Sequence, residues 1–540
     1  MSEAGAATAQ GGGWTPARSA AGGRSPWLVV FVISIATFME VLDSAIANVS
    51  LDHIAGSLSA SYDEATWVLT SYLISNAIVI PISGWLSDVI GRKRYYMMSV
   101  ALFAGSSLLC GLAPSLSVLI MARVLQGIGG GGLAPSEQAM LADTFPPQKR
   151  GLAFAAYGIV VIVGPILGPT LGGWITDNLS WHWIFLINVP IGALSLFLVH
   201  IFVDEPEAVK QDRANKLKGG LKVDYIGFAL IALGLGCLEF TLDRGQRDDW
   251  FTSPLITLSA AMSAICLIAL VPWELSHKDP VVNLRLFGRR NFAVTSVVML
   301  TVGMILFGTT QFIPQLLQQV LGYTATDAGM ALTAGGVATV LVMPFAGILS
   351  SKVDARILLG IALLIQATAL WHMTHLSTDM AFRDAAFARM WQAVGLPFLF
   401  VPITAVAYVG LEPGQNNQAS ALMNVTRNLG GSLGISLTQT LIAQRQQFHQ
   451  ARLTEQLNRF NPYYNSAING SAANFARHSH GAMQATQQAT ASLYRSVLNQ
   501  ATMLSFLDAF HVLMIVVFCV APVIFFMRAN HPGEAPAGAH

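Results

Sequence analysis

The sequence predicts an all-α integral membrane protein with fourteen transmembrane helices and both termini in the cytoplasm. Three observations support this fold class. The 540-residue chain is 53% hydrophobic and only 11% charged, whereas soluble domains carry about 25% charged residues. Apolar segments of about 20 residues, enough to cross a bilayer core of about 30 Å, recur along it. A short polar motif between two such segments returns in the second half of the chain.

The apolar segments divide into groups of six, two and six. The first six lie near 27–47, 66–86, 96–114, 118–140, 153–176 and 183–203. The next two lie near 224–243 and 254–273, and the last six near 292–316, 327–350, 356–375, 386–411, 420–441 and 504–527. Because the number of crossings is even, we expect both termini on one side of the membrane.

Basic residues in the short loops predict the orientation, because Lys and Arg concentrate on the cytoplasmic side. One set of loops holds most of them: Arg92, Lys93, Arg94, Lys149, Arg150, Lys210, Arg213, Lys216, Lys218, Lys222, Lys278, Arg285, Arg289, Arg290, Lys352 and Arg356. The opposite short loops hold only Arg244, Arg247 and Arg383. We therefore expect the first set of loops to face the cytoplasm.

The repeated polar motif predicts the domain organisation. Gly84–Arg94 follows the second segment of the first group, and a degenerate copy at Gly347–Arg356 follows the second segment of the last group. Duplicated helical bundles are common among membrane proteins of this size. The expected domains are a disordered cytoplasmic tail over 1–26, a six-helix bundle over 27–203, a linker with two extra transmembrane helices over 204–291, a second six-helix bundle over 292–527 that includes a polar periplasmic loop over 445–503, and a cytoplasmic tail over 528–540.

Five motifs follow one another along the first bundle. They are Leu42–Asn48 (LDSAIAN), Gly84–Arg94 (GWLSDVIGRKR), Arg123–Gly130 (RVLQGIGG), Gly164–Gly173 (GPILGPTLGG) and Trp181–Gly192 (WHWIFLINVPIG). With this combination, the chain over roughly 27–527 resembles the major facilitator superfamily and, within it, the fourteen-span drug:proton antiporters. Two features depart from the family pattern: the second polar motif lacks a Gly-Arg-Lys core, and the first segment carries Glu40 in addition to Asp43.

The resemblance implies a transporter that exports hydrophobic or amphipathic drugs in exchange for protons, by alternating access to a cavity between two rocking halves. It further implies the inner membrane of a Gram-negative bacterium, with a periplasmic adaptor protein and an outer-membrane channel as partners. The 445–503 loop is then a candidate docking surface. Two alternatives stay open: a dedicated exporter of one natural metabolite, such as a siderophore or a fatty acid, and a non-transporting membrane receptor or scaffold.

Other classes of function lack their sequence signatures. The net charge of +1 gives no sign of nucleic-acid binding. No Gly-x-x-x-x-Gly-Lys-Ser/Thr loop is present to bind ATP, and no loop holds a catalytic constellation. The four cysteines show neither a metal-binding spacing nor a disulfide framework. We therefore expect no enzyme activity, no cofactor and no metal, and we expect a proton gradient to drive transport.

Two acids in the first segment are the candidates for proton coupling, because an ionisable group at lipid depth is costly and marks function. Asp43 and Glu40 lie three residues apart and so share a helix face. Burial and like-charge repulsion both favour the protonated form of a carboxyl group. The alternative is a pair of acids that cap polar contacts near a helix end.

Arg123, in the fourth segment, is the expected partner of these acids. The resemblance implies that this arginine faces the central cavity and senses the acid of the first segment. The alternative is a purely structural ion pair between two helices.

The Gly84–Arg94 motif places an acid and bases at the cytoplasmic helix ends, where they can pair with each other and with helix dipoles. The resemblance implies that Gly84, Asp88, Gly91 and Arg92 close a cytoplasmic gate. Lys93 and Arg94 are interpreted mainly as membrane anchors, and anchoring is also the alternative for the whole motif.

The fifth segment combines small residues with prolines at Gly164, Pro165, Gly168, Pro169, Gly172 and Gly173. Small residues let helices approach closely, and proline bends a helix. The resemblance identifies this pattern as the antiporter motif, which is associated with export. Ordinary tight packing is the alternative.

Further polar residues inside the predicted spans are candidates for a substrate cavity: Gln126, Gln311, Gln366, Asn424 and Arg427. Glu239 and Asp243, in the linker pair, are expected near the outer membrane interface. Numerous Met and Phe residues suit an adaptable apolar pocket.

Overall fold

The computed structural model describes residues 25–205, 210, 213, 223–277, 279–411, 415–455, 457–458, 460–476 and 482–528. Over these ranges it consists of helices and connecting turns, with no strand, so the predicted all-α class is confirmed. Residues 1–24 and 529–540, which make up nearly all of the two predicted tails, lie outside the described residues. Most of the segment from 206 to 222 lies outside them too.

The first bundle is built from long helices whose starts follow simple sequence signals. These helices are α1 (Pro26–Val49), α4 (Trp67–Ile90), α5 (Arg92–Gly111), α6 (Leu116–Gly130), α7 (Leu133–Thr144), α8 (Pro147–Asn178) and α10 (Asn188–Phe202), with the short α2 (Leu51–Ser57), α3 (Tyr62–Ala65) and α9 (Trp183–Leu186) between them. Pro26 and Pro147 occupy first-turn positions, where a missing N–H costs nothing. Ser115 caps α6 by accepting a hydrogen bond from the backbone N–H of Val118.

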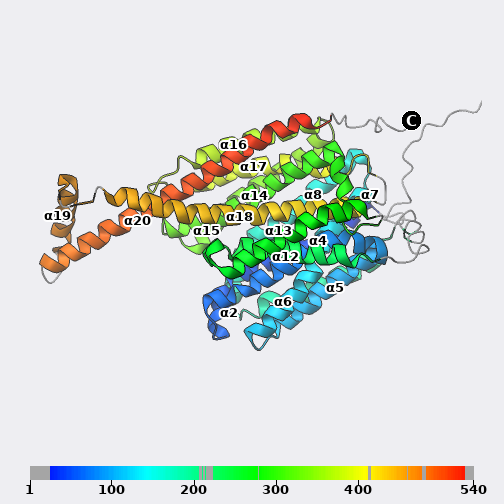
Figure 1. Cartoon of the computed structure of the whole chain (residues 1–540), viewed down its shortest axis with the longest axis horizontal. Coiled ribbons are helices and arrows are strands. Elements are labelled where there is room, and N and C mark those ends of the chain that lie inside the picture. The colour runs from blue at the N-terminus through cyan, green and yellow to red at the C-terminus, as the bar shows by residue number, and fades with distance from the viewer. Residues whose placement is uncertain are drawn as a thin grey trace, which may run out of the picture.

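The second bundle follows a helical pair and a short connection. The pair is α12 (Tyr225–Arg244) and α13 (Pro254–Ser276), with η1 (Trp250–Thr252) between them and η2 (Leu284–Gly288) after them. The second bundle holds α14 (Arg290–Gln319), α15 (Ala325–Ser350), α16 (Ala355–Met373), α17 (Phe382–Ala407), α18 (Asn416–Glu455), α19 (Pro462–Ala476), α20 (Ala482–Val520) and η4 (Ala521–Phe526). The helix α12 packs against both α4 and α18, so the pair lies along the seam between the bundles (Figure 1).

Eleven helical stretches of the described chain are long and apolar enough to cross a membrane. The other three predicted segments lie in α5, α8 and α18, which are 20, 32 and 40 residues long. These three helices are not among the eleven apolar stretches. All fourteen predicted segments are therefore helical, whereas fourteen membrane crossings stay a prediction.

The predicted polar loop over 445–503 is mostly helical over its described part. The helix α18 continues to Glu455 and α20 begins at Ala482, so both helices run well beyond the bundle, with α19 near their tips (Figure 1). Gln, Ala and Arg are good helix formers, which accounts for helix in so polar a sequence.

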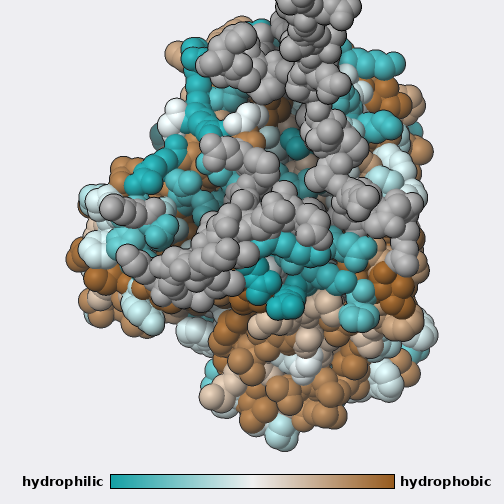
Figure 2. Space-filling model, turned by 90° about the vertical axis from the view of Figure 1, so that its right-hand side faces the viewer, coloured by the Kyte–Doolittle hydropathy of each residue, from teal (hydrophilic) through white to brown (hydrophobic). Residues whose placement is uncertain are grey.

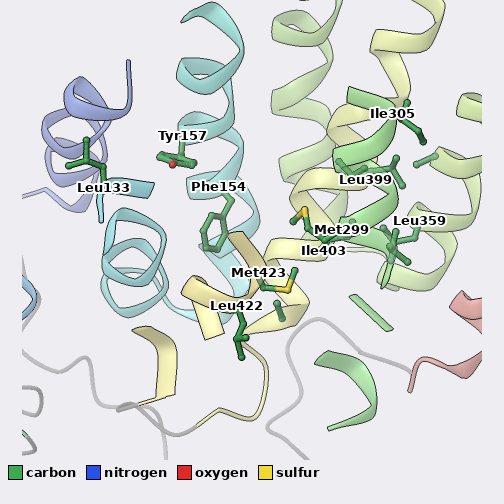
Figure 3. Packing of buried hydrophobic residues seen from close by; sticks show 14 of the residues in the cluster. Leu133, Phe154, Tyr157, Met299, Ile305, Leu359, Leu399, Ile403, Leu422 and Met423 are labelled. Atoms are coloured by element: carbon green, nitrogen blue, oxygen red, sulfur yellow. The ribbon is translucent and has the colours of Figure 1, made fainter. Parts of the chain in front are cut away.

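Direct hydrogen bonds between the two bundles gather at one end of the molecule, which we call the closed end. There Asn424 Nδ2 donates to Gln138 Oε1 (2.9 Å), and Ser420 Oγ donates to the backbone oxygen of Pro135 (2.7 Å). Behind these bonds, apolar residues of α7, α8, α14, α16, α17 and α18 form one buried cluster (Figure 3). Figure 2 looks onto the closed end, where hydrophilic residues gather near the middle and hydrophobic ones follow much of the rim.

Candidate functional site

A cavity of about 360 Å³ lies between the two bundles and is the candidate site. Residues of α1, α4, α8, α12, α14, α15, α17 and α18 line it, and most of its wall is apolar. Five charged side chains lie on the wall among several polar ones such as Asn76: Glu40, Glu239, Asp243, Arg389 and Arg427. An apolar pocket with a few converging polar groups is the usual form of a small-molecule site.

Glu40 presents its carboxyl group to this cavity from α1. Its Oε1 accepts hydrogen bonds from Tyr72 Oη (3.3 Å) and Asn76 Nδ2 (3.4 Å), both on α4. Among the described side chains, no cation lies within ion-pair distance of Glu40. Arg427, on α18, lines the same cavity and attracts this carboxyl group electrostatically. Glu40 is thus an acid with neutral partners in a space that a ligand can enter.

Asp43 has a different environment, because its side chain and that of Arg123 are both completely buried. Arg123 Nη1 donates to Asp43 Oδ2 (2.6 Å), and the guanidinium lies over the Tyr72 ring, 4.3 Å from its centroid. The other carboxylate oxygen accepts from Gln126 Nε2 (3.0 Å) and Asn188 Nδ2 (2.7 Å). The ion pair therefore belongs to a hydrogen-bonded network inside the first bundle, in which only Arg123 Nη2 and Asn188 Oδ1 have no hydrogen-bond partner among the described groups.

The two acids of α1 consequently point to different places. Successive helix residues are rotated by about 100°, so residues three apart are offset by about 60°. That offset directs Glu40 into the cavity and Asp43 toward Arg123. The resemblance implies an Arg123 that faces the cavity, and here the structure differs: Arg123 is buried and does not line the cavity wall. The physical reason is the buried ion-pair network, which holds the guanidinium between α1, α4 and α6.

The second bundle contains a counterpart of this network that the sequence analysis misses. Arg389 Nη1 donates to Thr309 Oγ1 (2.9 Å), as does Gln392 Nε2 (2.9 Å), and Arg389 also reaches Thr310. Arg389 and Gln392 repeat the Arg-x-x-Gln spacing of the first bundle, and a threonine of α14 takes the place of the acid. This internal repeat is the signal that could have identified Arg389.

The residues predicted to line a cavity are distributed over several environments. Arg427 lies on the cavity wall, whereas Gln126 belongs to the Asp43 network. Gln366 is buried and donates to the backbone oxygen of Gln392 (2.8 Å), and Asn424 binds Gln138 at the closed end. Gln311 lies on an exposed face of α14. Burial among helices, rather than polarity, decides which of these residues reach the cavity.

The linker helix α12 also contributes to the site. Glu239 and Asp243 line the central cavity, with Asp243 one residue before the end of α12, and their expected place near the outer interface stays a prediction. Ser432 Oγ of α18 donates to Glu239 Oε1 (2.8 Å), and the Thr70 hydroxyl of α4 donates to Asp243. Because α12 packs in the seam between α4 and α18, its polar face is turned inward.

Glu137, on α7, is a buried acid that the sequence analysis also misses. Its side chain is fully buried, accepts from Tyr96 Oη (3.0 Å) and is hydrogen-bonded to Thr37, which lines the cavity. The signal was available, because a glutamate inside an apolar segment marks function as much as Asp43 does.

The predicted gate residues lie at the closed end. Asn417 Nδ2 of α18 donates to Asp88 Oδ1 (2.6 Å), and Gln418 Nε2 approaches Asp88 Oδ2 (3.5 Å). Gly84 lies against the same turn of α18, where an added Cβ would be 3.0 Å from the Gln418 Cα. The motif of the first bundle therefore contacts the start of α18 directly.

The second part of the motif is held inside the first bundle. Gly91 ends α4 with φ of 100°, a conformation that favours glycine. Arg92 forms an ion pair with Asp143, and its backbone N–H donates to Glu205 Oε1 (2.7 Å). Asp143 in turn accepts from Asn416 Nδ2 of α18 (2.5 Å), which connects Arg92 to the second bundle through one intermediate.

The glycines of α8 provide close contact with α1. Added Cβ atoms at Gly164 and Gly172 would lie 2.8 Å from Val41 Cγ1 and 3.0 Å from Ile46 Cγ2, and one at Gly168 would overlap the Ala45 Cβ. Gly173 has no heavy atom within 4 Å of such a position. Pro165 lines the cavity, and the side chain of Pro169 lies outside the described part of the chain. The small residues of α8 therefore let the two helices pack closely.

Replacing Gly168 by Val is expected to destabilise the first bundle, because the new side chain overlaps Ala45 on α1. Overpacking of this kind costs about 1–3 kcal/mol, so the thermal unfolding midpoint in detergent should fall. Gly173→Ala is the matched control, since its Cβ enters open space. Equal midpoints for the two variants would contradict the close α1–α8 contact.

Comparisons with known proteins agree with this geometry. Residues 33–435 match the Major Facilitator Superfamily. Multidrug export protein EmrB of Haemophilus influenzae is 43% identical over 439 residues, which cover 81% of this chain and 84% of that protein. Multidrug export protein EmrB of Escherichia coli strain K12 is 36% identical over 515 residues, covering 95% and 98%. The solved structure of the proton:xylose symporter XylE, 12% identical, shares the fold with a TM-score of 0.59 and covers 94% of this chain and 97% of its own.

Proposed function

The chain belongs to the major facilitator superfamily, and from this premise we propose that it is a proton-coupled multidrug efflux antiporter of the bacterial inner membrane. It is a multi-pass membrane protein of a transporter family. The observation that carries the proposal is the central cavity, whose wall is mostly apolar and holds Glu40 without an ion-pair partner. Hydrophobic or amphipathic compounds suit such a wall.

Alternating access supplies the mechanism. The closed end, where Asp88 and Asp143 contact α18, corresponds to one facing state of the cavity. Glu40 accepts a proton from the outer aqueous phase, and this neutralisation weakens its attraction to Arg427. Rocking of the halves then separates α4 and α7 from α18 and opens the cavity to the cytoplasm. The proton leaves Glu40 to the cytoplasm as a drug enters the cavity from that side. Exchange requires only that proton and drug differ in affinity for the two states.

The Asp43–Arg123 network has a positioning role in this proposal. It fixes α1 against α6 and α4, and so orients Glu40 toward the cavity three residues away. The proton gradient is the energy source, and neither ATP nor a cofactor takes part.

The helical projection of α18, α19 and α20 is the proposed contact with a periplasmic adaptor, which in turn leads to an outer-membrane channel. Phe460, Tyr463 and Met483 are 95%, 86% and 80% exposed near its tip. Exposed large apolar side chains on a projecting part of a protein are candidates for contact with a partner. Replacing these three residues by Ser is expected to abolish co-purification of the adaptor while proton-driven transport in liposomes persists. Undiminished co-purification would contradict this docking site.

The proposed function is tested with purified protein in liposomes that carry an internal pH dye. Adding a panel of unrelated hydrophobic drugs should change the internal pH only in vesicles with protein, and an imposed proton gradient should drive drug movement. If a single compound saturates the protein and no other moves, the chain is a dedicated exporter. If no compound moves and no proton flux follows, the chain is a receptor or scaffold.

A further inference from the structure

We propose that the linker helix α12 supplies a cation-binding subsite of the central cavity, in which Glu239 and Asp243 bind the positively charged group of an amphipathic organic cation. The inference rests on the proposed function and names one of its substrate classes. It also assigns a role to the inserted helical pair: α12 forms part of the cavity wall and is not only a connection between the two bundles.

The placement of the two carboxyl groups follows from the packing of α12. Residues four apart lie on one helix face, so both acids point the same way. Ser432 on one side and Thr70 on the other donate hydrogen bonds to them, which aims the carboxyl groups across the seam between α18 and α4. Both residues belong to the cavity wall.

Neither acid is neutralised by the protein. Over the described ranges, no Lys, Arg or His forms an ion pair with Glu239 or Asp243. Arg244, the adjacent cation, instead pairs with Asp248 (3.5 Å) and lies over the Trp67 ring, 5.3 Å from its centroid. Glu239 is only 6% exposed, and its Oε2 accepts no hydrogen bond from any described group. A buried carboxylate of this kind is costly until a cation pairs with it, and a ligand can supply that cation.

The charged groups of the cavity come from different helices, which gives a ligand a preferred orientation. The acids come from α1 and α12, whereas the guanidinium groups of Arg389 and Arg427 come from α17 and α18. A positive ligand group is therefore attracted toward the acids of α12 and repelled by Arg389 and Arg427. The rings of Phe307 and Phe400 line the same cavity, and aromatic faces attract organic cations.

The test compares tetraphenylphosphonium, a lipophilic cation, with triphenylphosphine oxide, a neutral compound of similar shape. Binding of each to the purified full-length protein is measured by equilibrium dialysis, together with proton-driven transport in liposomes. The variant is the double substitution Glu239→Gln/Asp243→Asn, whose side chains retain oxygen acceptors for Ser432 and Thr70. The matched control is Asp248→Asn, which removes a carboxylate just beyond α12 and outside the cavity.

The double variant is expected to weaken binding of the cation by about tenfold or more, as expected for loss of a close charge partner, and to leave the neutral compound within about twofold. The control should bind both compounds as the unmodified protein does. Equal weakening of both compounds, or an unchanged affinity for the cation, would overturn the subsite. Thermal unfolding of each variant shows whether a loss of binding comes from misfolding. If the double variant does not fold, the same binding measurements are made on the single variants Glu239→Gln and Asp243→Asn. Dialysis needs no proton gradient, so it tests the subsite independently of transport. If the double variant selectively loses cation binding but the unmodified protein shows no proton-driven transport, the proposed function is contradicted and the subsite is not.

Discussion

Replacing Asp43 by Asn is expected to abolish proton-driven efflux and to destabilise the folded protein. The substitution leaves the Arg123 guanidinium, which is completely buried, without its counter-charge. Breaking a buried ion pair by removing one partner typically costs about 3–5 kcal/mol. Since the ion pair joins α1 to α6, its loss should also leave the Glu40 side chain less firmly oriented toward the cavity. Drug efflux from liposomes and the unfolding midpoint in detergent measure the two effects.

The double variant Asp43→Asn/Arg123→Gln separates stability from transport. With both charges removed, no uncompensated charge remains, and the unfolding midpoint should return toward that of the unmodified protein. Efflux should stay low if the ion pair is needed for transport. A double variant that exports at the full rate would show that the pair serves stability alone.

Replacing Glu40 by Gln is expected to reduce proton-driven efflux to the level of protein-free liposomes, with little change in stability. Gln keeps the size of the side chain and can still accept hydrogen bonds from Tyr72 and Asn76, but it cannot exchange a proton. Exchange of labelled for unlabelled drug across the membrane, which needs no proton gradient, should persist. Proton release on addition of drug is the direct measurement.

Glu64→Gln is the matched control for this experiment. Glu64 is exposed on α3, away from the cavity, and Gln also supports the capping interaction with Ser61. The control should export normally. If Glu40→Gln exports drug as fast as this control against a gradient, then Glu40 is not the exchanging group. The buried acids Asp43 and Glu137 would then be the remaining carboxyl groups of the first bundle to examine.

Much of the helical architecture could be predicted because it follows from local composition. Helices begin where the sequence places proline or a capping residue, as at Pro26 and Ser115. The helices of 445–503 have a weaker signal, since a polar, amide-rich segment has no hydrophobic period. In that region local propensity is the only signal.

The site was less predictable, because sequence position does not report the direction of a side chain. Asp43 and Glu40 are equivalent by spacing, yet one is buried against Arg123 and the other lines a cavity. Gln126 and Arg427 are similarly alike as polar residues within apolar segments, and only Arg427 reaches the cavity. Arg389 could have been found from the repeated Arg-x-x-Gln spacing, which points to a second network by symmetry.

By itself the sequence determined that this protein is a set of apolar helices with a few ionisable groups at lipid depth. The physical reason is that the bilayer leaves helices as the main way for a chain of this composition to satisfy its backbone. Only the tertiary structure decided which ionisable groups are paired and which face the cavity. That outcome depends on the rotation of each helix and on the position of α12 between α4 and α18, and both are set by packing between segments far apart in the chain.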